Sequence, residues 1–397
     1  MTPKSAPKAS PRLLVWLAGL LAVIVAVAIA LAGGAAHAAT YRAPRTAFGA
    51  PDLQGLWTNT ALTFLQRPPI FKGLIATDKE EAMMLSMFKK MAGDILSPDP
   101  IDPKLPAPPV VKEAPQADFI EMDLHLGRID GQPRTSWIVD PADGRLPFTD
   151  AEKKARAAAA KAPEVFDNPE NRDTQERCLT AIGSPEGPPM MNTGFNGHYQ
   201  ILQTKDYVAI EVEMNHDGRI VRMGDRTHQP AAVNPWLGDS VGWWEGDTLV
   251  VETTNLNTKG HVYSLGGGFR YSPQTKITER FTRTAKDRIL YQFSVEDPEV
   301  FTRPWRAEMP MRAAKGPIYE YACHEGNYSL PNILAGARAQ EKAAATQAAK
   351  GCGAPPTRRG PRGGWRRAPL RRPARRRSSR RRRSRPRPPL RPPPPYR

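Results

Sequence analysis

The feature that most constrains the fold is a succession of short strand patterns between Gly197 and Glu325. The segments YVAIEVEM, GRIVRM, GDTLVVETTNL, KITERFTRT, RILYQFSVED, TRPWRAEMP and PIYEYACHE are rich in β-branched and aromatic residues, and turn signals separate them. Alternate residues of RILYQFSVED are apolar, namely Ile289, Tyr291, Phe293 and Val295. The series predicts a mainly β protein, an antiparallel meander that forms a barrel or a strongly curved sheet.

A first helix is predicted in TDKEEAMMLSMFKKMAG. It begins with Thr77 and Glu80 in a capping box and reaches a glycine stop at Gly93. A stripe of apolar residues at helical spacing is typical of core packing rather than of a cofactor contact. The stripe consists of Met83, Met84, Met87, Phe88 and Met91.

Two further helices complete the expected fold. The segment TDAEKKARAAAAKA repeats the capping box with Thr149 and Glu152, and its polar composition places it on the surface. The segment LPNILAGARAQEKAAATQAAK has Pro331 near its first position, which is typical of a helix start. We therefore expect a mixed, proline-rich region over residues 39–196, packed on a β-meander or barrel of residues 197–350 with a closing C-terminal helix.

Residues 1–38 have the pattern of a signal peptide. A basic start precedes an apolar run from Leu13 to Leu31, and Ala36-His37-Ala38 fits the small-x-small cleavage pattern. The length of the run leaves a retained membrane anchor as the alternative. We expect cleavage after Ala38 and a periplasmic or secreted protein, which would touch a membrane only through an uncleaved N-terminal segment.

Residues 351–397 have a different composition from the rest of the chain. They contain 18 arginines and no lysine, aspartate or glutamate, so the net charge of +17 belongs to this tail. One interpretation is a disordered basic arm for nucleic acid or an anionic surface. The other is a frameshift in a GC-rich gene, which is favoured because the preceding body uses lysine freely. The tail cannot form a core in either case, and we expect no nucleic-acid partner for the folded body.

The cysteines agree with export. Cys178 and Cys323 lie in the body, and in an oxidising compartment they most simply form one disulfide. The alternative is a reactive thiol at Cys323 beside His324. Neighbouring residues of a strand point to opposite faces, which argues against that pairing.

The stretch EMNHDGRIVRMGDRTH, residues 213–228, holds two histidines and several carboxylates, and its pattern favours a hairpin over a metal site. Asp217-Gly218 is a strong two-residue turn signal. This turn opposes apolar with apolar and charge with opposite charge. The expected pairs are Met214 with Val221, Val212 with Met223, and Glu213 with Arg222.

This register also separates the two histidines. His216 faces Arg219 at the tip, whereas a straight continuation of the strand places His228 near Tyr207. The distance between the two histidines is then about 30 Å, too long for a shared metal ion.

No high-specificity motif for catalysis, phosphate binding or metal binding occurs in the sequence. We therefore expect no metal ion and no cofactor. The segment SLGGGFRY contains a glycine run without a following helix or lysine, and it is interpreted as a flexible loop between strands.

The candidate catalytic residues are scattered along the β region. His324 follows the disulfide cysteine at a predicted strand end, which would present it rigidly as a base or ligand. A histidine bonded to a loop carbonyl is the structural alternative there, and an exposed hairpin tip is the alternative for His216. The full set is His324, Glu325, His216, His228 and Asp239.

Aromatic residues suggest a ligand-binding wall. Trp243 and Trp244 are adjacent on one strand, so one can pack in the core while the other faces outward or into a pocket. Such a wall suits an apolar or sugar-like ligand, and core packing is the alternative. The candidate ligand-binding residues are Trp236, Trp243, Trp244, Arg219 and Arg226.

Several segments resemble an uncharacterised family of exported bacterial proteins. They are PDLQGLWTN, NPWLGDSVGWWEGDTLVVETTNL, ERFTR, FTRPWRAEMPM and GPIYEYACHEGNYSLPNILAGARA, which span about Pro51 to Ala339. That family has no assigned activity, and its members end shortly after the GARA helix, so the arginine tail departs from the pattern. The run from GWWEGDTLV to RILYQFSVEDP also resembles the meanders of calycin or lipocalin-like barrels. This second resemblance implies an internal cavity for a small, mostly apolar molecule.

Three functions remain open. The first is an exported protein that binds a small apolar molecule in a barrel-like cavity. The second is a periplasmic hydrolase, lyase or isomerase that uses histidine and carboxylate groups for general acid–base chemistry. The third is a structural or envelope interaction protein. The β patterns favour the first because the catalytic signals are diffuse.

Overall fold

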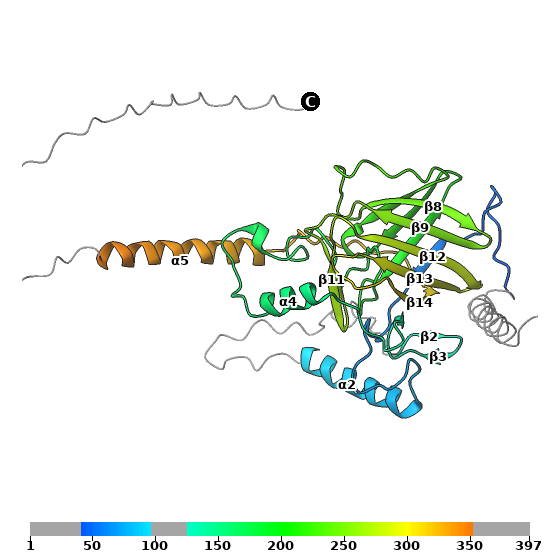
Figure 1. Ribbon diagram of the computed structural model, residues 1–397, viewed down its shortest axis with the longest axis horizontal. Coiled ribbons are helices and arrows are strands. Elements are labelled where there is room, and N and C mark those ends of the chain that lie inside the picture. Colours follow the sequence, from blue (N-terminus) through cyan, green and yellow to red (C-terminus); the bar gives the residue numbers. More distant parts are fainter. Residues whose placement is uncertain (1–40, 97–124, 352–397) are drawn as a thin grey trace, which may run out of the picture. The chain divides into compact units, whose positions relative to one another are not determined.

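The computed structural model describes residues 41–96 and 125–351 (Figure 1). The expected signal peptide and all of the arginine tail beyond residue 351 lie outside the described residues. The chain separates into two units, residues 1–341 and 342–397, and the barrel described below belongs to the first. No helix within the described ranges is long and apolar enough to cross a bilayer.

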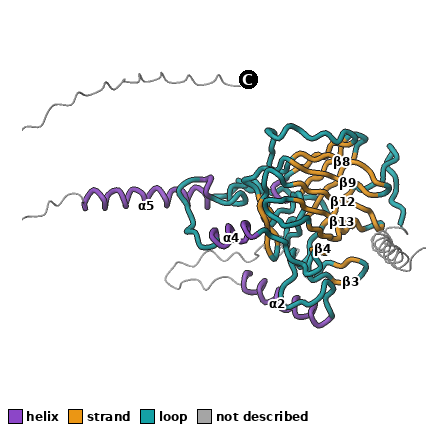
Figure 2. The backbone as a smooth tube through the Cα atoms, in the orientation of Figure 1, coloured by secondary structure: helices purple, strands orange, loops and turns teal. Residues whose placement is uncertain are grey.

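Nine strands form a closed barrel, which confirms the expected fold class (Figures 1 and 2). The barrel closes because β14 pairs with β1. The order around it is β1 (Gly55–Thr58), β5 (His198–Gln203), β6 (Tyr207–Val212), β7 (Gly218–Met223), β8 (Asp239–Glu245), β9 (Thr248–Thr254), β12 (Lys276–Ala285), β13 (Arg288–Glu296) and β14 (Trp305–Ala313). A short tenth strand, β4 (Ile138–Asp140), pairs with β14. Strand β1 lies in the segment DLQGLWTNTALTFLQRP, whose pattern indicates a strand, but it belongs to the barrel itself rather than to a region packed on it.

The barrel is mixed rather than purely antiparallel. Strands β7 and β8 pair in parallel, so the chain cannot turn back in a hairpin between them. Residues 224–238 instead run from the end of β7 to the opposite end of the barrel, where β8 begins. The prediction of an antiparallel meander is therefore wrong at this one junction.

The hairpin between β6 and β7 has a different register from the one expected. Glu211 pairs with Gly218 and Val208 with Val221, so residues 213–217 form a longer connection that includes the 3-10 turn η2 (Met214–His216). Asn215 and His216 adopt positive φ angles of 63° and 53°, which the two-residue turn signal did not indicate. The observed register places Val208 opposite Val221, where Met214 was expected, which is a shift of six residues. Because six is an even number, the side chains of β6 and β7 keep the faces of the sheet that were expected for them.

A second hairpin replaces the flexible loop expected at SLGGGFRY. It consists of β10 (His261–Ser264) and β11 (Gly267–Arg270), which lie between β9 and β12 in sequence. A Cβ atom on Gly268 would lie 2.0 Å from the carbonyl oxygen of Val262, so this glycine allows the close approach of the two strands. A short hairpin of β2 (Arg128–Ile129) and β3 (Gln132–Pro133) lies elsewhere.

The strand expected at PIYEYACHE is also wrong. Residues 317–322 have no regular secondary structure, and residues 323–326 form a turn. The backbone of this segment is held by hydrogen bonds to side chains: Tyr319 N–H donates to Glu213 and Tyr321 N–H donates to His216. The segment is therefore attached to the barrel by side-chain contacts and not by pairing with a strand.

The three expected helices are present as α2 (Asp78–Leu96), α4 (Asp150–Ala159) and α5 (Ser329–Gly351). The capping box of α2 is complete, because Glu80 N–H donates to Thr77 and Thr77 N–H donates to the Glu80 carboxylate. Gly93 does not end α2, since the helix continues to Leu96. The apolar stripe is only partly a core face: Met84 and Phe88 are buried, whereas Met83 and Met87 are exposed. The side chain of Met91 lies outside the described residues.

Large buried side chains line the inside of the barrel. Trp57, Tyr199, Phe281 and Tyr291 are all at most 2% exposed and belong to one hydrophobic cluster. The alternation expected in RILYQFSVED is confirmed, since its four apolar residues are all buried in that cluster. Arg219 does not lie at an exposed hairpin tip, because its side chain is 3% exposed and pairs with Glu279.

Residues 185–191 close one end of the barrel. Met190 N–H donates to the Tyr291 hydroxyl at 2.8 Å, and the hydroxyl groups of Tyr271 and Tyr199 donate to backbone carbonyls of Pro188 and Pro185. The hydroxyl groups of these three tyrosines therefore bind the backbone of residues 185–191. Glu186 is buried within it, and burial raises the pKa of its carboxyl group from 4.5 to about 8.

Because Glu186 is held neutral, we predict that the free energy of unfolding depends on pH. A raised folded-state pKa contributes stability that is complete below the unfolded value of 4.5 and is lost as the pH rises through about 8. Substituting Glu186→Gln should remove about 3–5 kcal/mol of the stability loss between about pH 5 and about pH 8.5. Urea unfolding at both pH values measures this difference. Glu170→Gln, at an exposed position, is the control, and equal pH dependence in the two variants would contradict the burial argument.

Candidate functional site

A groove of about 490 Å3 lies at the end of the barrel opposite the closing segment. The turns between β5 and β6 and between β8 and β9 meet at this end, and residues 45–51 pass beside them. The groove is lined by Arg45, Phe48, Gly49, Ala50, Pro51, Lys205, Met223, Gly224, Trp243, Trp244 and Gly246.

Two inward-facing residues of the wall form the floor of this groove. Met223 of β7 and Trp244 of β8 pack against the hydrophobic cluster of the barrel, and both also line the groove. Side chains alternate along a strand, so Trp243 faces the opposite way from Trp244. This confirms the expectation that one tryptophan packs on the core while its neighbour does not.

The outward tryptophan is held by two polar contacts. The Arg226 guanidinium lies 4.0 Å from the centre of the Trp243 ring, and Trp243 Nε1–H donates to Glu245 at 2.9 Å. Together these contacts fix the indole at the edge of the groove. Arg226 and both tryptophans were expected at a ligand site, and the structure brings these three together.

A tight turn supplies the other side of the groove. Thr46 accepts a hydrogen bond from Gly49 N–H and donates its hydroxyl to the Ala50 carbonyl, and Gly49 has a φ of +85°. The turn presents Phe48, which is 40% exposed. Sequence reasoning missed Phe48 and Lys205. Both residues are far from Trp244 in the sequence, and no local pattern indicates that they lie near it in the fold.

The rim of the groove is cationic. Arg45 pairs with Asp247 in the β8–β9 turn. Lys205 is exposed and forms no ion pair with another described residue. The groove therefore combines an apolar floor with one unpaired positive charge.

Two of the expected catalytic residues converge outside this groove. His228 Nδ1 lies 2.9 Å from Asp239 Oδ2, and His228 Nε2 lies 3.3 Å from Glu252. Arg222 donates to both carboxylate oxygens of Asp239 at 2.9 Å. Burial raises the pKa of Asp239, but hydrogen bonds from Gln229 N–H, His228 and Arg222 outweigh it, and the net shift is downward.

The His228 cluster attaches the crossover to the barrel wall. His228 and Gln229 belong to residues 224–238, whereas Asp239 and Glu252 belong to β8 and β9. Both ring nitrogens of His228 contact carboxylates, so the cluster is satisfied by protein groups. The chain does turn after Met223, contrary to the straight continuation expected, but His228 and His216 still share no partner.

The remaining expected residues lie apart from the groove. His216 accepts a hydrogen bond from Tyr321 N–H at 3.2 Å. His324 and Glu325 are exposed in a turn, and Trp236 is half-buried in the crossover. Arg219 lies inside the barrel.

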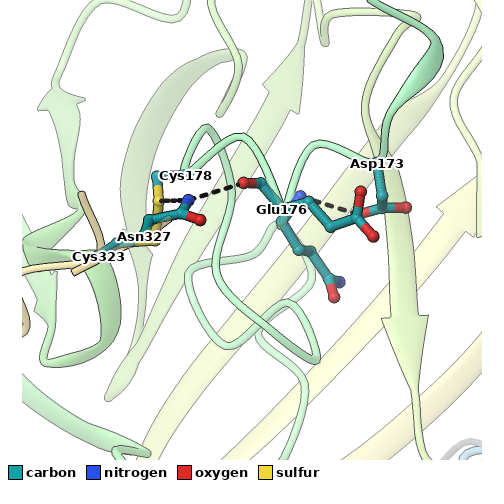
Figure 3. The surroundings of a disulfide bond; sticks show 6 residues. Asp173, Glu176, Cys178, Cys323 and Asn327 are labelled. Atoms are coloured by element: carbon teal, nitrogen blue, oxygen red, sulfur yellow. Dashed lines mark hydrogen bonds between the residues drawn. A yellow bond between two sulfur atoms is a disulfide. The ribbon is translucent and has the colours of Figure 1, made fainter. Parts of the chain in front are cut away.

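The disulfide between Cys178 and Cys323 is present, as expected (Figure 3). Asn327 Nδ2 donates to the Glu176 carbonyl at 3.0 Å beside it, and Gln175 N–H donates to Asp173 at 2.8 Å. The bond therefore ties the segment after β14 to the turn that carries Asp173. A disulfide is compatible with an oxidising, exported location.

Sequence reasoning missed a second histidine–carboxylate contact near the disulfide. The Tyr263 hydroxyl donates to Asp173 Oδ2, and His261 Nε2 lies 3.3 Å from the same oxygen. Burial raises the pKa of Asp173, but these two side chains and Gln175 N–H lower it to about 2. The partners lie far apart in the sequence, so no motif indicates them.

Comparison with models of known protein families finds no matching family, and comparison with curated proteins finds no significantly similar one. Among residues 41–96 and 125–351, no group of three or more His, Cys, Asp or Glu side chains is placed to hold a metal ion.

We predict that the disulfide contributes strongly to stability. The two cysteines are 145 residues apart, and closing so long a loop in the unfolded chain is worth up to about 5 kcal/mol. Substituting Cys178→Ala together with Cys323→Ala should lower the free energy of urea unfolding by about 2–5 kcal/mol. Cys352→Ala is the control and should change nothing, whereas a double variant as stable as this control would contradict the prediction.

Proposed function

We propose that this chain is an exported protein, periplasmic or secreted, that binds a small and mostly apolar molecule at the end of its barrel. The observation that carries the proposal is the groove floor, where Trp244 and Met223 extend the barrel core to an open surface. A ligand seated there would bury its apolar body against an existing core rather than against loose loops. Export is supported by the signal-peptide pattern and by the disulfide.

The position of the groove differs from the internal cavity implied by lipocalin-like barrels. The inward side chains of the described strands are large, buried and in one cluster. The ion pair of Arg219 and Glu279 also occupies the interior. We therefore assign the ligand to the mouth of the barrel rather than to its centre.

The lining of the groove favours binding over catalysis. None of its residues is a histidine, aspartate, glutamate, serine or cysteine. General acid–base or nucleophilic catalysis at neutral pH normally requires such a group, or a lysine desolvated in an apolar pocket, within hydrogen-bond reach of the substrate. Lys205 lines the groove but is exposed to solvent. Lys205 is better suited to attract a polar or acidic end of the ligand.

The proposal predicts that the full-length protein binds Nile red, an uncharged dye whose emission rises in apolar surroundings. Phe48→Ala should weaken this binding about tenfold, because truncating the exposed ring removes about 1.4 kcal/mol of apolar contact. Trp244→Ala should weaken it further. Dye titration followed by fluorescence gives the dissociation constants.

Phe166→Ala is the matched control, because Phe166 is 41% exposed against 40% for Phe48 and does not line the groove. This variant should bind Nile red as the parent does. If Phe48→Ala and Phe166→Ala have equal affinities, the ligand does not lie in this groove. Circular dichroism of each variant separates lost binding from lost fold.

A further inference from the structure

A second groove, of about 530 Å3, is lined by α4 and the β10–β11 hairpin. Figure 1 shows α4 beside β11. The hairpin belongs to the connection between β9 and β12, at the opposite end of the barrel from the groove described above. One wall is the helix, through Glu152, Arg156 and Ala159, and the other is the hairpin, through Val262, Phe269 and Arg270.

A buried carboxylate organises the charges of this groove. The side chain of Glu152 is 2% exposed, and it accepts a hydrogen bond from Arg270 Nε at 2.8 Å. Arg156 Nη1 lies 3.9 Å from the same carboxylate. The expected reciprocal capping bond to Thr149 is therefore not made by Glu152, whose carboxylate instead faces the two guanidinium groups.

Both guanidinium groups retain free donors. Arg270 uses only Nε for Glu152, and its two terminal nitrogens bond to no other described residue. Arg156 lies 4.6 Å above the Phe148 ring, which orients its plane. The two side chains are 46% and 43% exposed, so their remaining N–H groups are accessible. Two permanent positive charges against one negative charge leave this part of the groove cationic.

The rest of the groove is apolar. Val262 and Phe269 are buried, and Phe269 packs edge-on against Trp305 and Phe301 of the barrel end. Ala155 and Ala159 leave the helix wall without long side chains. His261 and Tyr263 line the groove as well, and their contacts with Asp173 hold β10 in place.

We propose that this groove is a second binding site, which takes a small organic anion. Its acid group, a carboxylate, sulfonate or phosphate, accepts hydrogen bonds from the terminal nitrogens of Arg156 and Arg270. Its apolar body lies against Ala155 and Ala159 of the helix wall, facing the hairpin. Guanidinium groups are suited to this task because their planar fork matches the oxygens of an acid group.

The test is a fluorescence titration of the full-length protein with 8-anilinonaphthalene-1-sulfonate, which joins an acid group to an apolar body. Ala159→Glu places a negative charge one helical turn from Arg156 without touching the buried pair, and it should weaken binding about tenfold. Ala159→Gln has the same size without the charge, so it accounts for any steric effect, and it should bind about tenfold more tightly than Ala159→Glu. Equal affinities in these two variants would overturn the proposal.

A second pair of variants tests Arg270 itself. Arg270→Gln should also weaken binding about tenfold, because it removes the free donors and half of the positive charge. Arg128→Gln is the control, since Arg128 is 44% exposed, pairs with Glu81 and lines neither groove. The arginine tail is present in every variant, so any binding to it is common to all. Anilinonaphthalene sulfonate affinity that is equal in the Arg270 and Arg128 variants would count against the site.

The two grooves can fail separately. Arg270→Gln should leave Nile red binding unchanged, and Phe48→Ala should leave anilinonaphthalene sulfonate binding unchanged. If Phe48→Ala weakened both dyes while Ala159→Glu weakened neither, the second site would be wrong and the barrel-end site would remain.

Discussion

The ion pair between Arg219 and Glu279 is the interaction on which the rest of the barrel depends. Arg219 lies on β7 and Glu279 on β12, with β8 and β9 between them in the sheet, so their two hydrogen bonds cross the interior. Glu279 also accepts from the Tyr291 hydroxyl at 2.7 Å, and that hydroxyl accepts from Met190 N–H at 2.8 Å. One chain of hydrogen bonds thus joins three strands to the segment that closes the barrel. Removing either charge would leave the other buried without a partner, which costs about 3–5 kcal/mol.

This use of the interior determines where a ligand can bind. A barrel whose centre holds an ion pair and large aromatic side chains offers its apolar surface at its ends. At one end, Trp244 and Met223 carry the core to an open groove. At the other, the β10–β11 hairpin and α4 enclose a groove with charged and apolar walls. Both sites are built from connections, while the barrel supplies a rigid base for them.

Local patterns predicted the elements, whereas contacts between distant residues could not be predicted. The alternation of β13 and the capping box of α2 depend on a few consecutive residues, and both are confirmed. Asp217-Gly218 is an equally local signal, but it misled, because the positive φ angles of Asn215 and His216 lengthen the connection. The pairing of Arg219 with Glu279 and that of Asp173 with His261 join residues 60 and 88 positions apart, for which the sequence carries no periodicity.

The residues of the barrel-end groove were likewise predictable only where they are neighbours in the sequence. Trp243 and Trp244 were found because two adjacent aromatic residues on a strand must face opposite sides. Phe48 and Lys205 reach them from other parts of the chain, and the pairing of β1, β5, β6, β7 and β8 side by side brings these groups together. Glycines of SLGGGFRY suggested flexibility, although Gly268 permits the close pairing of β10 and β11.

The most direct test of the central claim is native mass spectrometry of the protein recovered after export. The account predicts an additional mass of a small organic molecule, which is lost on denaturation and is absent from the Trp244→Ala variant. Identical native and denatured masses, with no mass gained after incubation with a small-molecule extract of the exporting cells, would contradict the claim that this barrel binds a ligand at its end.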